Sequence, residues 1–392
     1  MRLLAIDVGT GTQDVLLFDS NEELENCPQL VMPSPTAIVA QRVRAATAAG
    51  SPVVLTGVTM GGGPCHWAAM DHVRAGHAVY ATPDAARTFD DDLASVARMG
   101  IRLVSDDEAR TIQGAVQVEL RDLYYDEILA ALRGFGVEGP PDALALAVFD
   151  HGNAPPGYSD RVFRFDYLAA KVGEGLAAFA YDRAEVPPAL TRLAAAATTA
   201  PVDVPVLLMD TGPAAVLGAL DDREVRSAQN VIALNVGNFH CLAFHLRAPT
   251  RSQPPATNAT VRLSGRLARF AQQKAPAWEI LGLFEHHTGE ITSAQLERFI
   301  SRLASGELSN AEIFDSQGHG ALVRAGLSTE ERAFLAVTGP RRGLIRDSAL
   351  QPYFAVPHGD MMLTGCFGLL RAYAHRYPEV AELIERRLGP PA

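Results

Sequence analysis

The stretch LLAIDVGTGTQDVLLF, residues 3–18, decides how the rest of the sequence is interpreted. Two apolar runs, residues 3–6 and 15–18, flank a segment rich in Gly, Thr and Asp. Apolar runs bounded in this way are typical of a β-hairpin. The glycines at positions 9 and 11 permit positive φ angles and let a ligand approach the backbone closely. The pattern therefore predicts two strands joined by a turn that a ligand can reach.

Two interpretations of this turn follow from its residue types. In the first, its backbone N–H groups and the hydroxyls of Thr10 and Thr12 cradle a phosphate, while Asp7 holds Mg²⁺ through water. In the second, the turn only connects two strands, which is the commoner case for an isolated Gly/Thr turn. The remainder of the chain has to decide between them.

Composition limits the class of protein. A chain of 392 residues has room for two or three domains. Its net charge of −11 argues against binding nucleic acid or anionic membranes non-specifically. We find no secretory signal pattern and no apolar run near the ~18–20 residues that span a bilayer. The four cysteines are far apart, without zinc or iron–sulfur spacing. We therefore expect a reduced, soluble, cytoplasmic protein with neither nucleic-acid nor membrane partners.

The layout of strand, polar glycine turn and strand recurs in the second half, over residues 231–246. This recurrence predicts an internal duplication with a cleft between the two halves. We expect an N-terminal lobe over residues 1–202, a C-terminal lobe over residues 203–358, and a closing helix over residues 359–392 that packs back on the first lobe.

Several histidines follow strands or stand beside acidic residues and glycines. A core strand of the first half ends in Asp150 and His151, at the strand end where α/β sheets bind ligands. His286, His287 and His319 have the residue type of a transition-metal ligand or a general base. Their spacing equally fits scattered structural histidines. Both interpretations stay open, the first with His151 handling a second substrate in the cleft.

Three stretches, taken in order, resemble the ATPase fold shared by actin, sugar kinases, acetate kinase and the heat-shock chaperone ATPases. They are the turn DVGTGT at residues 7–12, the segment 210–221 followed by a second turn at 234–239, and the stretch TGPRRGLI within residues 337–345. The resemblance implies an α/β protein with a duplicated ribonuclease-H-like fold, in which two lobes enclose a central cleft.

More narrowly, the stretches TMGGGP, DHGNAPPGYSDR, EHHTG, GHGA, TGPRR and PHGDMMLTGCFGL resemble an uncharacterised prokaryotic family of this superfamily. Its members often carry the label "pyruvate formate-lyase activating". A radical activase needs three closely spaced cysteines for a [4Fe–4S] cluster, and this sequence has none. The label is therefore not supported by the chemistry of the chain.

The superfamily resemblance implies that ATP and Mg²⁺ bind in the cleft and that a phosphoryl group passes to water or to a small-molecule acceptor. It assigns the ion and the catalytic acids to Asp7 and Asp210. It places around the phosphates Gly9, Thr10, Gly11, Thr12, Gln13, Asn235, Gly237 and Asn238, and beside the adenosine Gly339, Pro340 and Arg341.

One departure from the superfamily pattern bears on activity. Asn235 stands where an aspartate usually helps to position Mg²⁺ or the attacking water, and an amide supplies no charge to the metal. A non-hydrolysing nucleotide sensor, a metal-dependent enzyme that uses the cleft histidines, and a fold without any nucleotide site are the alternatives to an ATPase or small-molecule kinase. The acceptor and the oligomeric state have no signature in the sequence.

Overall fold

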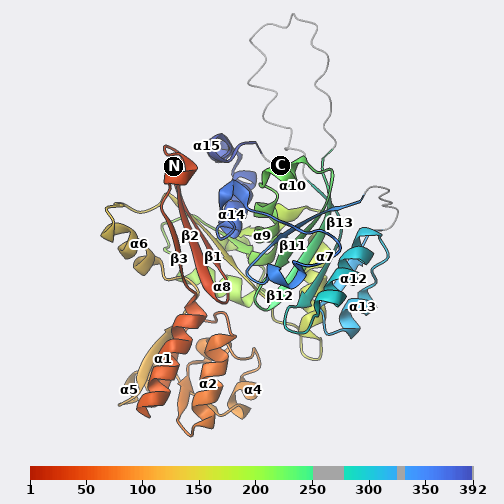
Figure 1. Cartoon of the computed structure of the whole chain (residues 1–392). Coiled ribbons are helices and arrows are strands. Elements are labelled where there is room, and N and C mark those ends of the chain that lie inside the picture. Colours follow the sequence, from red (N-terminus) through yellow and green to blue (C-terminus); the bar gives the residue numbers. More distant parts are fainter. Residues whose placement is uncertain (250–277, 325–331, 391–392) are drawn as a thin grey trace, which may run out of the picture.

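The computed structural model describes residues 1–249, 278–324 and 332–390, which form two six-stranded sheets and one four-stranded sheet (Figure 1). In spatial order, the first sheet contains β3 (Gln29–Pro33), β2 (Thr12–Asp19), β1 (Arg2–Val8), β8 (Ala143–Val148), β10 (Val206–Asp210) and β9 (Ala180–Asp182). The second contains β14 (Gly320–Val323), β13 (Glu279–His287), β12 (His240–Arg247), β11 (Asn230–Val236), β15 (Phe334–Thr338) and β16 (Tyr353–Phe354).

The two large sheets repeat one topology. In the first, β1 pairs antiparallel with β2 and parallel with β8, and β10 continues parallel to β8. In the second, β11 pairs antiparallel with β12 and parallel with β15, and β16 continues parallel to β15. Every residue of β8, ALALAV, is buried, as expected of a central strand covered on both faces. The protein therefore has a duplicated ribonuclease-H-like α/β fold, as in actin-like ATPases, with two lobes.

A separate small domain is inserted in the first lobe between β3 and β8, at the bottom of Figure 1. Its parallel sheet contains β6 (Ile101–Leu103), β5 (Val79–Ala81), β4 (Val53–Gly57) and β7 (Val116–Leu120). Its helices are α1 (Pro35–Ala49), α2 (Pro64–Arg74), α3 (Pro83–Ala86), α4 (Leu93–Arg98) and α5 (Asp106–Thr111). The residues 1–202 that we expected to form one lobe thus contain two sheets.

The remaining helices flank the two large sheets. In the first lobe they are α6 (Tyr125–Gly134), α7 (Asp160–Lys171) and α8 (Thr191–Thr199), and in the second α10 (Arg223–Ser227), α12 (Ser293–Ala304) and α13 (Asn310–Asp315). Helix α15 (Pro378–Leu388) follows near the C-terminus. Within the described residues, no helix is both long and apolar enough to span a membrane.

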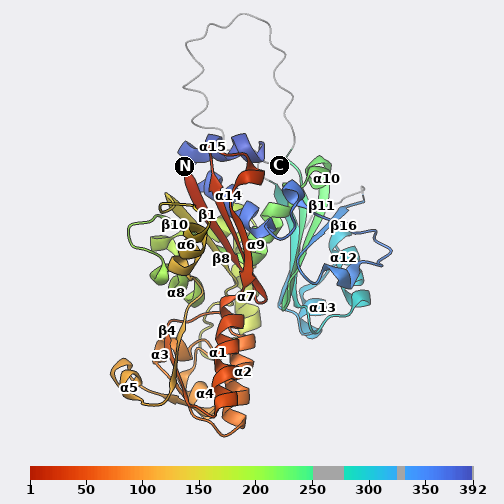
Figure 2. The same cartoon turned by 60° about the vertical axis from the view of Figure 1, so that its left-hand side comes forward.

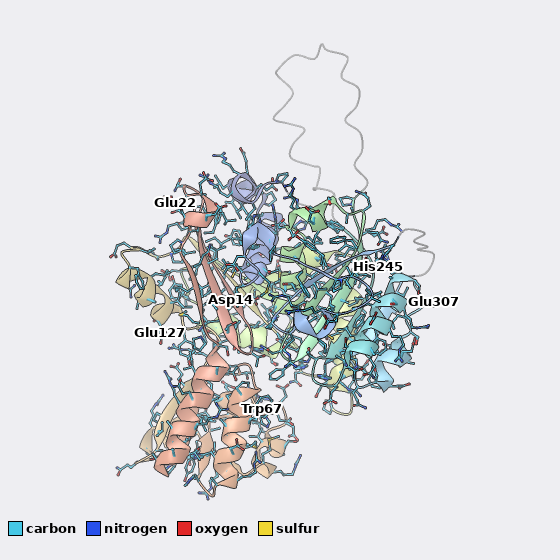
Figure 3. The ribbon with its side chains drawn as sticks, viewed as in Figure 1. Asp14, Glu22, Trp67, Glu127, His245 and Glu307 are labelled. Carbon is cyan, nitrogen blue, oxygen red and sulfur yellow. The ribbon has the colours of Figure 1, made fainter. Side chains whose placement is uncertain are left out.

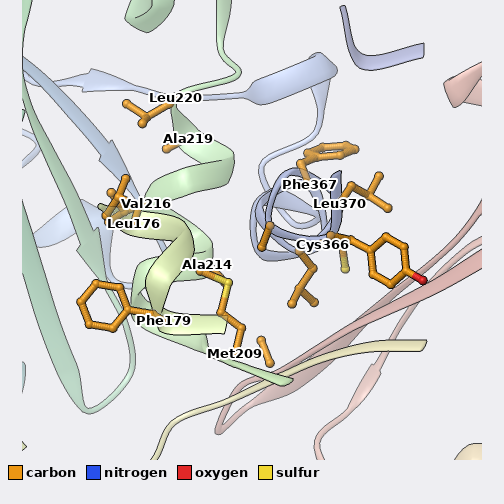
Figure 4. Packing of buried hydrophobic residues seen from close by; sticks show 14 of the residues in the cluster. Leu176, Phe179, Met209, Ala214, Val216, Ala219, Leu220, Cys366, Phe367 and Leu370 are labelled. Carbon is orange, nitrogen blue, oxygen red and sulfur yellow. The ribbon is translucent and has the colours of Figure 1, made fainter. Parts of the chain in front are cut away.

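Two helices pack against each other between the sheets: α9 (Thr211–Ala219), which follows β10, and α14 (Thr364–Arg376), which follows β16 (Figures 1 and 2). A Cβ atom on Gly218 would lie 1.8 Å from the carbonyl oxygen of Thr364, and one on Gly368 would lie 1.9 Å from that of Ala214. The backbones are therefore in direct contact at both points. Apolar side chains from both helices fill the surrounding core (Figure 4).

Helix α14 also contacts the first hairpin. The Cys366 thiol lies 3.6 Å from the carbonyl oxygen of Ala5 and 3.2 Å from that of Asp14. Farther along the helix, Nε of Arg371 donates to a carboxylate oxygen of Asp221 at 2.8 Å, and both side chains are almost fully buried. The closing helix is thereby held against β1, β2 and the end of α9.

We expect Gly218→Ala and Gly368→Ala each to destabilise the protein, because the new methyl group has to push two backbones apart. Overpacking of this kind lowers the free energy of unfolding by about 1–3 kcal/mol, which denaturant titration measures. Gly134→Ala is the matched control, since Gly134 lies in α6 and a Cβ atom there would have no atom within 4 Å. Equal stability of all three variants would contradict the close packing of α9 and α14.

Candidate functional site

The two hairpin turns that open the lobes are built in the same way. In the first, the N–H of Gly9 donates to the carbonyl oxygen of Thr12 at 2.9 Å, and in the second, the N–H of Gly237 donates to that of His240 at 2.9 Å. The Ser34 hydroxyl donates to the carbonyl oxygen of Thr10 at 2.6 Å and so anchors the first turn to the start of the inserted domain. The recurrence seen in the sequence is thus also a recurrence of local geometry.

The two turns face each other. A Cβ atom on Gly11 would lie 3.2 Å from the side-chain nitrogen Nδ2 of Asn238. The second turn also contacts the inserted domain, where a Cβ on Gly63 would lie 2.7 Å from the Phe239 ring. Phe239 meets the exposed Trp67 of α2 edge-on, with ring centroids 5.4 Å apart; Trp67 is labelled in Figure 3. Three parts of the chain therefore converge around these turns.

Between them lies a cavity of about 390 Å³. From the first lobe it is lined by residues 7–12, 14, 149–152, 191, 192, 211, 212 and 215, and from the inserted domain by residues 36, 59–63, 87, 88 and 91. The second lobe and the start of α14 contribute residues 235, 237–240, 242, 285, 338–340, 361, 362, 364 and 365. Gln13 and Arg341 are not among the lining residues: Gln13 is buried with its amide donating to Pro33, and Arg341 is exposed.

Two carboxylates of the first hairpin lie side by side at the cavity, because Asp7 on β1 is the register partner of Asp14 on β2. The Thr211 hydroxyl donates to Oδ1 of Asp7 at 2.6 Å, whereas Oδ1 of Asp14 is buried without a hydrogen-bond partner in the described residues. A Cβ on Gly365 would lie 1.9 Å from an Asp7 oxygen, so only glycine allows the first turn of α14 to approach this carboxylate.

Burial and mutual repulsion shift the protonation of this pair. Burial raises the pKa of Asp7 to about 6, partly countered by the Thr211 hydrogen bond and reinforced by the charge of Asp210. Burial, together with the charge of Asp7, raises the pKa of Asp14 to about 7. Two carboxylates that are costly to ionise together make a favourable environment for a cation.

Asp210 lies elsewhere, which corrects its expected role as a Mg²⁺ ligand. Its carboxylate is fully buried and ion-paired with Arg164, which donates from Nη2 to Oδ1 at 3.1 Å and also contacts Oδ2. Oδ1 further accepts from the N–H of Gly212 at the start of α9. Both oxygens of Asp210 are thus engaged in hydrogen bonds, and the residue does not line the cavity.

The predicted histidine cluster is partly assembled. His151 and His319 come together with His240, which no sequence motif had marked as a ligand, and one ring nitrogen of each lies within 4.8 Å of the others. The ring centroids of His287 and His319 are 4.5 Å apart. His286 points elsewhere, with Nε2 2.9 Å from the carbonyl oxygen of Ser316.

Asp150 does not join this cluster either. Its carboxylate accepts from the N–H groups of Gly152 and Leu193, both at 2.8 Å, and so fixes the turn that carries His151. Two cations at the cavity, Arg87 and Arg192, were not predicted from the sequence. Arg192 is paired with Asp122, and no motif marks either arginine.

The chain belongs to the family described as "Putative pyruvate format-lyase activating enzyme (DUF1786)", whose model matches residues 60–251 and 273–344 and thus more than half of the sequence. No curated protein matches the chain. Two solved structures are similar over nearly all of it. One is a ROK family transcriptional regulator described as a homolog of the E. coli MLC protein, 8% identical, with TM-score 0.27 and coverage of 99% of this chain and 80% of the other. The second is an exopolyphosphatase-like protein, 9% identical, with TM-score 0.24 and coverage of 100% and 93%.

The residues present do not fit the [4Fe–4S] cluster that a radical activase would need. Cys27, Cys65, Cys241 and Cys366 are all buried and free. Within the described parts of the chain, no group of potential metal ligands includes a cysteine. Burial also raises the pKa of Cys65 to about 11 and that of Cys241 to about 12, which disfavours the thiolate form that binds iron.

The raised pKa values of Asp7 and Asp14 predict how stability depends on pH. A carboxyl group whose folded pKa exceeds its unfolded value stabilises the fold fully at low pH and loses that contribution as pH rises through the folded value. Without added cations, the free energy of unfolding of Asp7→Asn and of Asp14→Asn should therefore rise by about 1–2 kcal/mol relative to wild type as the pH rises from about 4 to about 7. Thermal unfolding across this range measures the difference. Parallel stability curves for wild type and both variants would contradict the raised pKa values.

Proposed function

We propose that this protein binds a nucleoside triphosphate, ATP in the first instance, with Mg²⁺ in the cavity between its lobes, and transfers the terminal phosphoryl group to water or to a small-molecule acceptor. One observation carries this proposal: two equivalent glycine turns face each other across a cavity that has an unneutralised carboxylate pair in its wall.

The turns suit the phosphate end of the ligand. Gly9, Gly11 and Gly237 keep bulky side chains away from the backbone of these turns, and the N–H groups other than those of Gly9 and Gly237, which close the turns, are suited to bind phosphate oxygens. The hydroxyl of Thr10 adds a further donor at the cavity, whereas that of Thr12 hydrogen-bonds Asp14. Phosphoryl transfer depends mainly on positioning and charge stabilisation, which such a clamp supplies.

The carboxylate pair suits Mg²⁺. In this proposal Asp7 and Asp14 would hold the ion, directly or through water, and the ion would neutralise charge that develops on the phosphates. Asp14 supplies from β2 a negative charge that Asn235 of the second lobe lacks. The loss of the aspartate in the second turn is thereby offset within the first hairpin, which favours an enzyme over a non-hydrolysing sensor.

Another part of the cavity wall suits the nucleoside. Gly339, Pro340, Met361 and Met362 line the cavity, and apolar side chains beside an accessible backbone are typical of a purine site. Gly339 has a φ of 97°, and a Cβ there would lie 2.6 Å from Oδ1 of Asn235. The close approach of this turn to β11 thus requires glycine, and the Asn235 side chain lies against the turn.

Isothermal titration of the full-length protein with a non-hydrolysable ATP analogue and Mg²⁺ tests binding. We expect binding in the wild type and in Asp126→Asn, an exposed aspartate of α6, and much weaker binding in Asp7→Asn. Phosphate release under single-turnover conditions should fall about 10²–10³-fold in Asp7→Asn, which is the usual cost of removing one electrostatic group from a reaction centre.

Trp67 provides an independent signal, because its ring contacts Phe239 of the second turn. Nucleotide binding should change its fluorescence, and Trp67→Phe should abolish that change without abolishing binding. Absence of heat and of a fluorescence change at millimolar nucleotide would overturn the proposal. Tight binding without phosphate release in the wild type would instead support the sensor.

A further inference from the structure

We propose that His151, His240 and His319 bind a divalent transition-metal ion that links the two lobes. One ring nitrogen from each lies within 4.8 Å of the other two. Neutral imidazoles are the preferred ligands of Zn²⁺, Cu²⁺, Ni²⁺ and Fe²⁺. The proposal is independent of nucleotide binding.

The three ligands come from both lobes. His151 lies shortly after β8 of the first sheet, whereas His240 begins β12 and His319 directly precedes β14 of the second sheet. An ion held by all three would therefore connect the two sheets at the cavity. His240 also belongs to the hydrogen bond that closes the second turn, so the ion would fix that turn.

Unpaired nitrogen atoms are the second, independent observation. Nε2 of His240 and both ring nitrogens of His319 are buried without a hydrogen-bond partner in the described residues, and the His319 residue is only 1% exposed. Leaving such groups unpaired costs free energy, and buried polar atoms in native proteins nearly always have partners. A metal ion would satisfy one nitrogen on each ring.

Tight packing holds the rings in place. Gly152, directly after His151, has a φ of 75°, and a Cβ there would lie 2.5 Å from the Phe163 ring. The glycines on both sides of His319 are equally crowded, each with an atom 2.5 Å from its Cβ position. The Phe149 ring stacks on His240 at a centroid distance of 4.1 Å. The ligands are thus largely pre-organised by the fold.

An acidic group behind His319 completes the arrangement. Oε2 of Glu285 is 3.8 Å from Nδ1 of His319, slightly beyond hydrogen-bond length. Arg164 orients Glu285 through Nε and Nη2, which donate to its two oxygens at 3.0 Å each. Metal-binding histidines usually donate their second N–H to such a carboxylate. Nε2 of His319 is then the nitrogen that remains for the metal.

Metal binding should also tighten the cluster. Metal–nitrogen bonds of about 2.1 Å in tetrahedral geometry place the nitrogens about 3.4 Å apart, so a pair at the limit of 4.8 Å would have to close by up to about 1.4 Å. Three protein ligands leave one position of a tetrahedral ion for water or another ligand. Because His151 and His240 line the cavity, that ligand would come from the cavity.

Titration of the chelator-treated, full-length protein with Zn²⁺ and Co²⁺ tests the site. We expect one ion per chain, with visible Co²⁺ absorption bands of a low-coordinate nitrogen site. His151→Gln and His319→Gln should each weaken metal binding at least about 100-fold. Replacing a residue that only hydrogen-bonds a metal ligand already lowers metal affinity about 10–100-fold. His77→Gln, a half-buried histidine of the inserted domain, is the control and should bind normally.

A second readout tests the link between the lobes. Zn²⁺ should raise the melting temperature of wild type and His77→Gln but not of His151→Gln, and it should slow amide exchange around both His151 and His319. Absence of stoichiometric binding, or wild-type affinity in His151→Gln, would overturn the proposal. If His319→Gln fails to fold, His151→Gln decides, because His151 is exposed and its replacement leaves the core intact. These measurements use no nucleotide, so their failure is distinct from failure of ATP binding.

Discussion

Much of this structure depends on the ion pairs that one fully buried arginine forms between the lobes. Arg164, on α7, is 0% exposed and pairs with Asp210 of the first lobe and Glu285 of the second. Its guanidinium also donates to the carbonyl oxygen of Asp150 at 3.0 Å and lies 4.4 Å from the centre of the Phe149 ring. Removing one partner of a buried ion pair typically costs about 3–5 kcal/mol, so the lobes are strongly held at this point.

This network also divides the acidic groups of the interior by role. Asp210 and Glu285 have a cation built into the protein, whereas Asp7 and Asp14 have none among the described residues. Of these four groups, Asp7 and Asp14 therefore have uncompensated negative charge at the cavity, and the raised pKa values express the same fact. An aspartate at the end of a core strand can thus resemble a metal ligand in the sequence and still form a structural ion pair.

Most of the fold could be predicted from local sequence, but the site only in part. The duplication could be predicted from the hairpin at residues 3–18 and its recurrence, because alternating apolar runs and glycine turns are short-range signals. Asp14 was missed although the hairpin register places it beside Asp7. The pairing of Asp210 with Arg164 joins residues 46 positions apart, and His240 meets His319 across the intervening strand β13. Such contacts depend on tertiary packing, which no local pattern encodes.

The packing of α9 against α14 has a consequence for how the lobes can move. Gly218 of α9 lies against the backbone of Thr364 in α14, and Gly368 of α14 lies against the backbone of Ala214 in α9. Each helix therefore makes the same contact with the other. Such an isologous interface is usual between identical subunits of a dimer, and here it survives within one chain. A rotation about the pseudo-two-fold axis through this crossing changes both contacts equally. Backbone contact at both points opposes movement of one helix along the other. Together with the ion pairs of Arg164, the helix pair therefore restricts how far the two lobes can move apart.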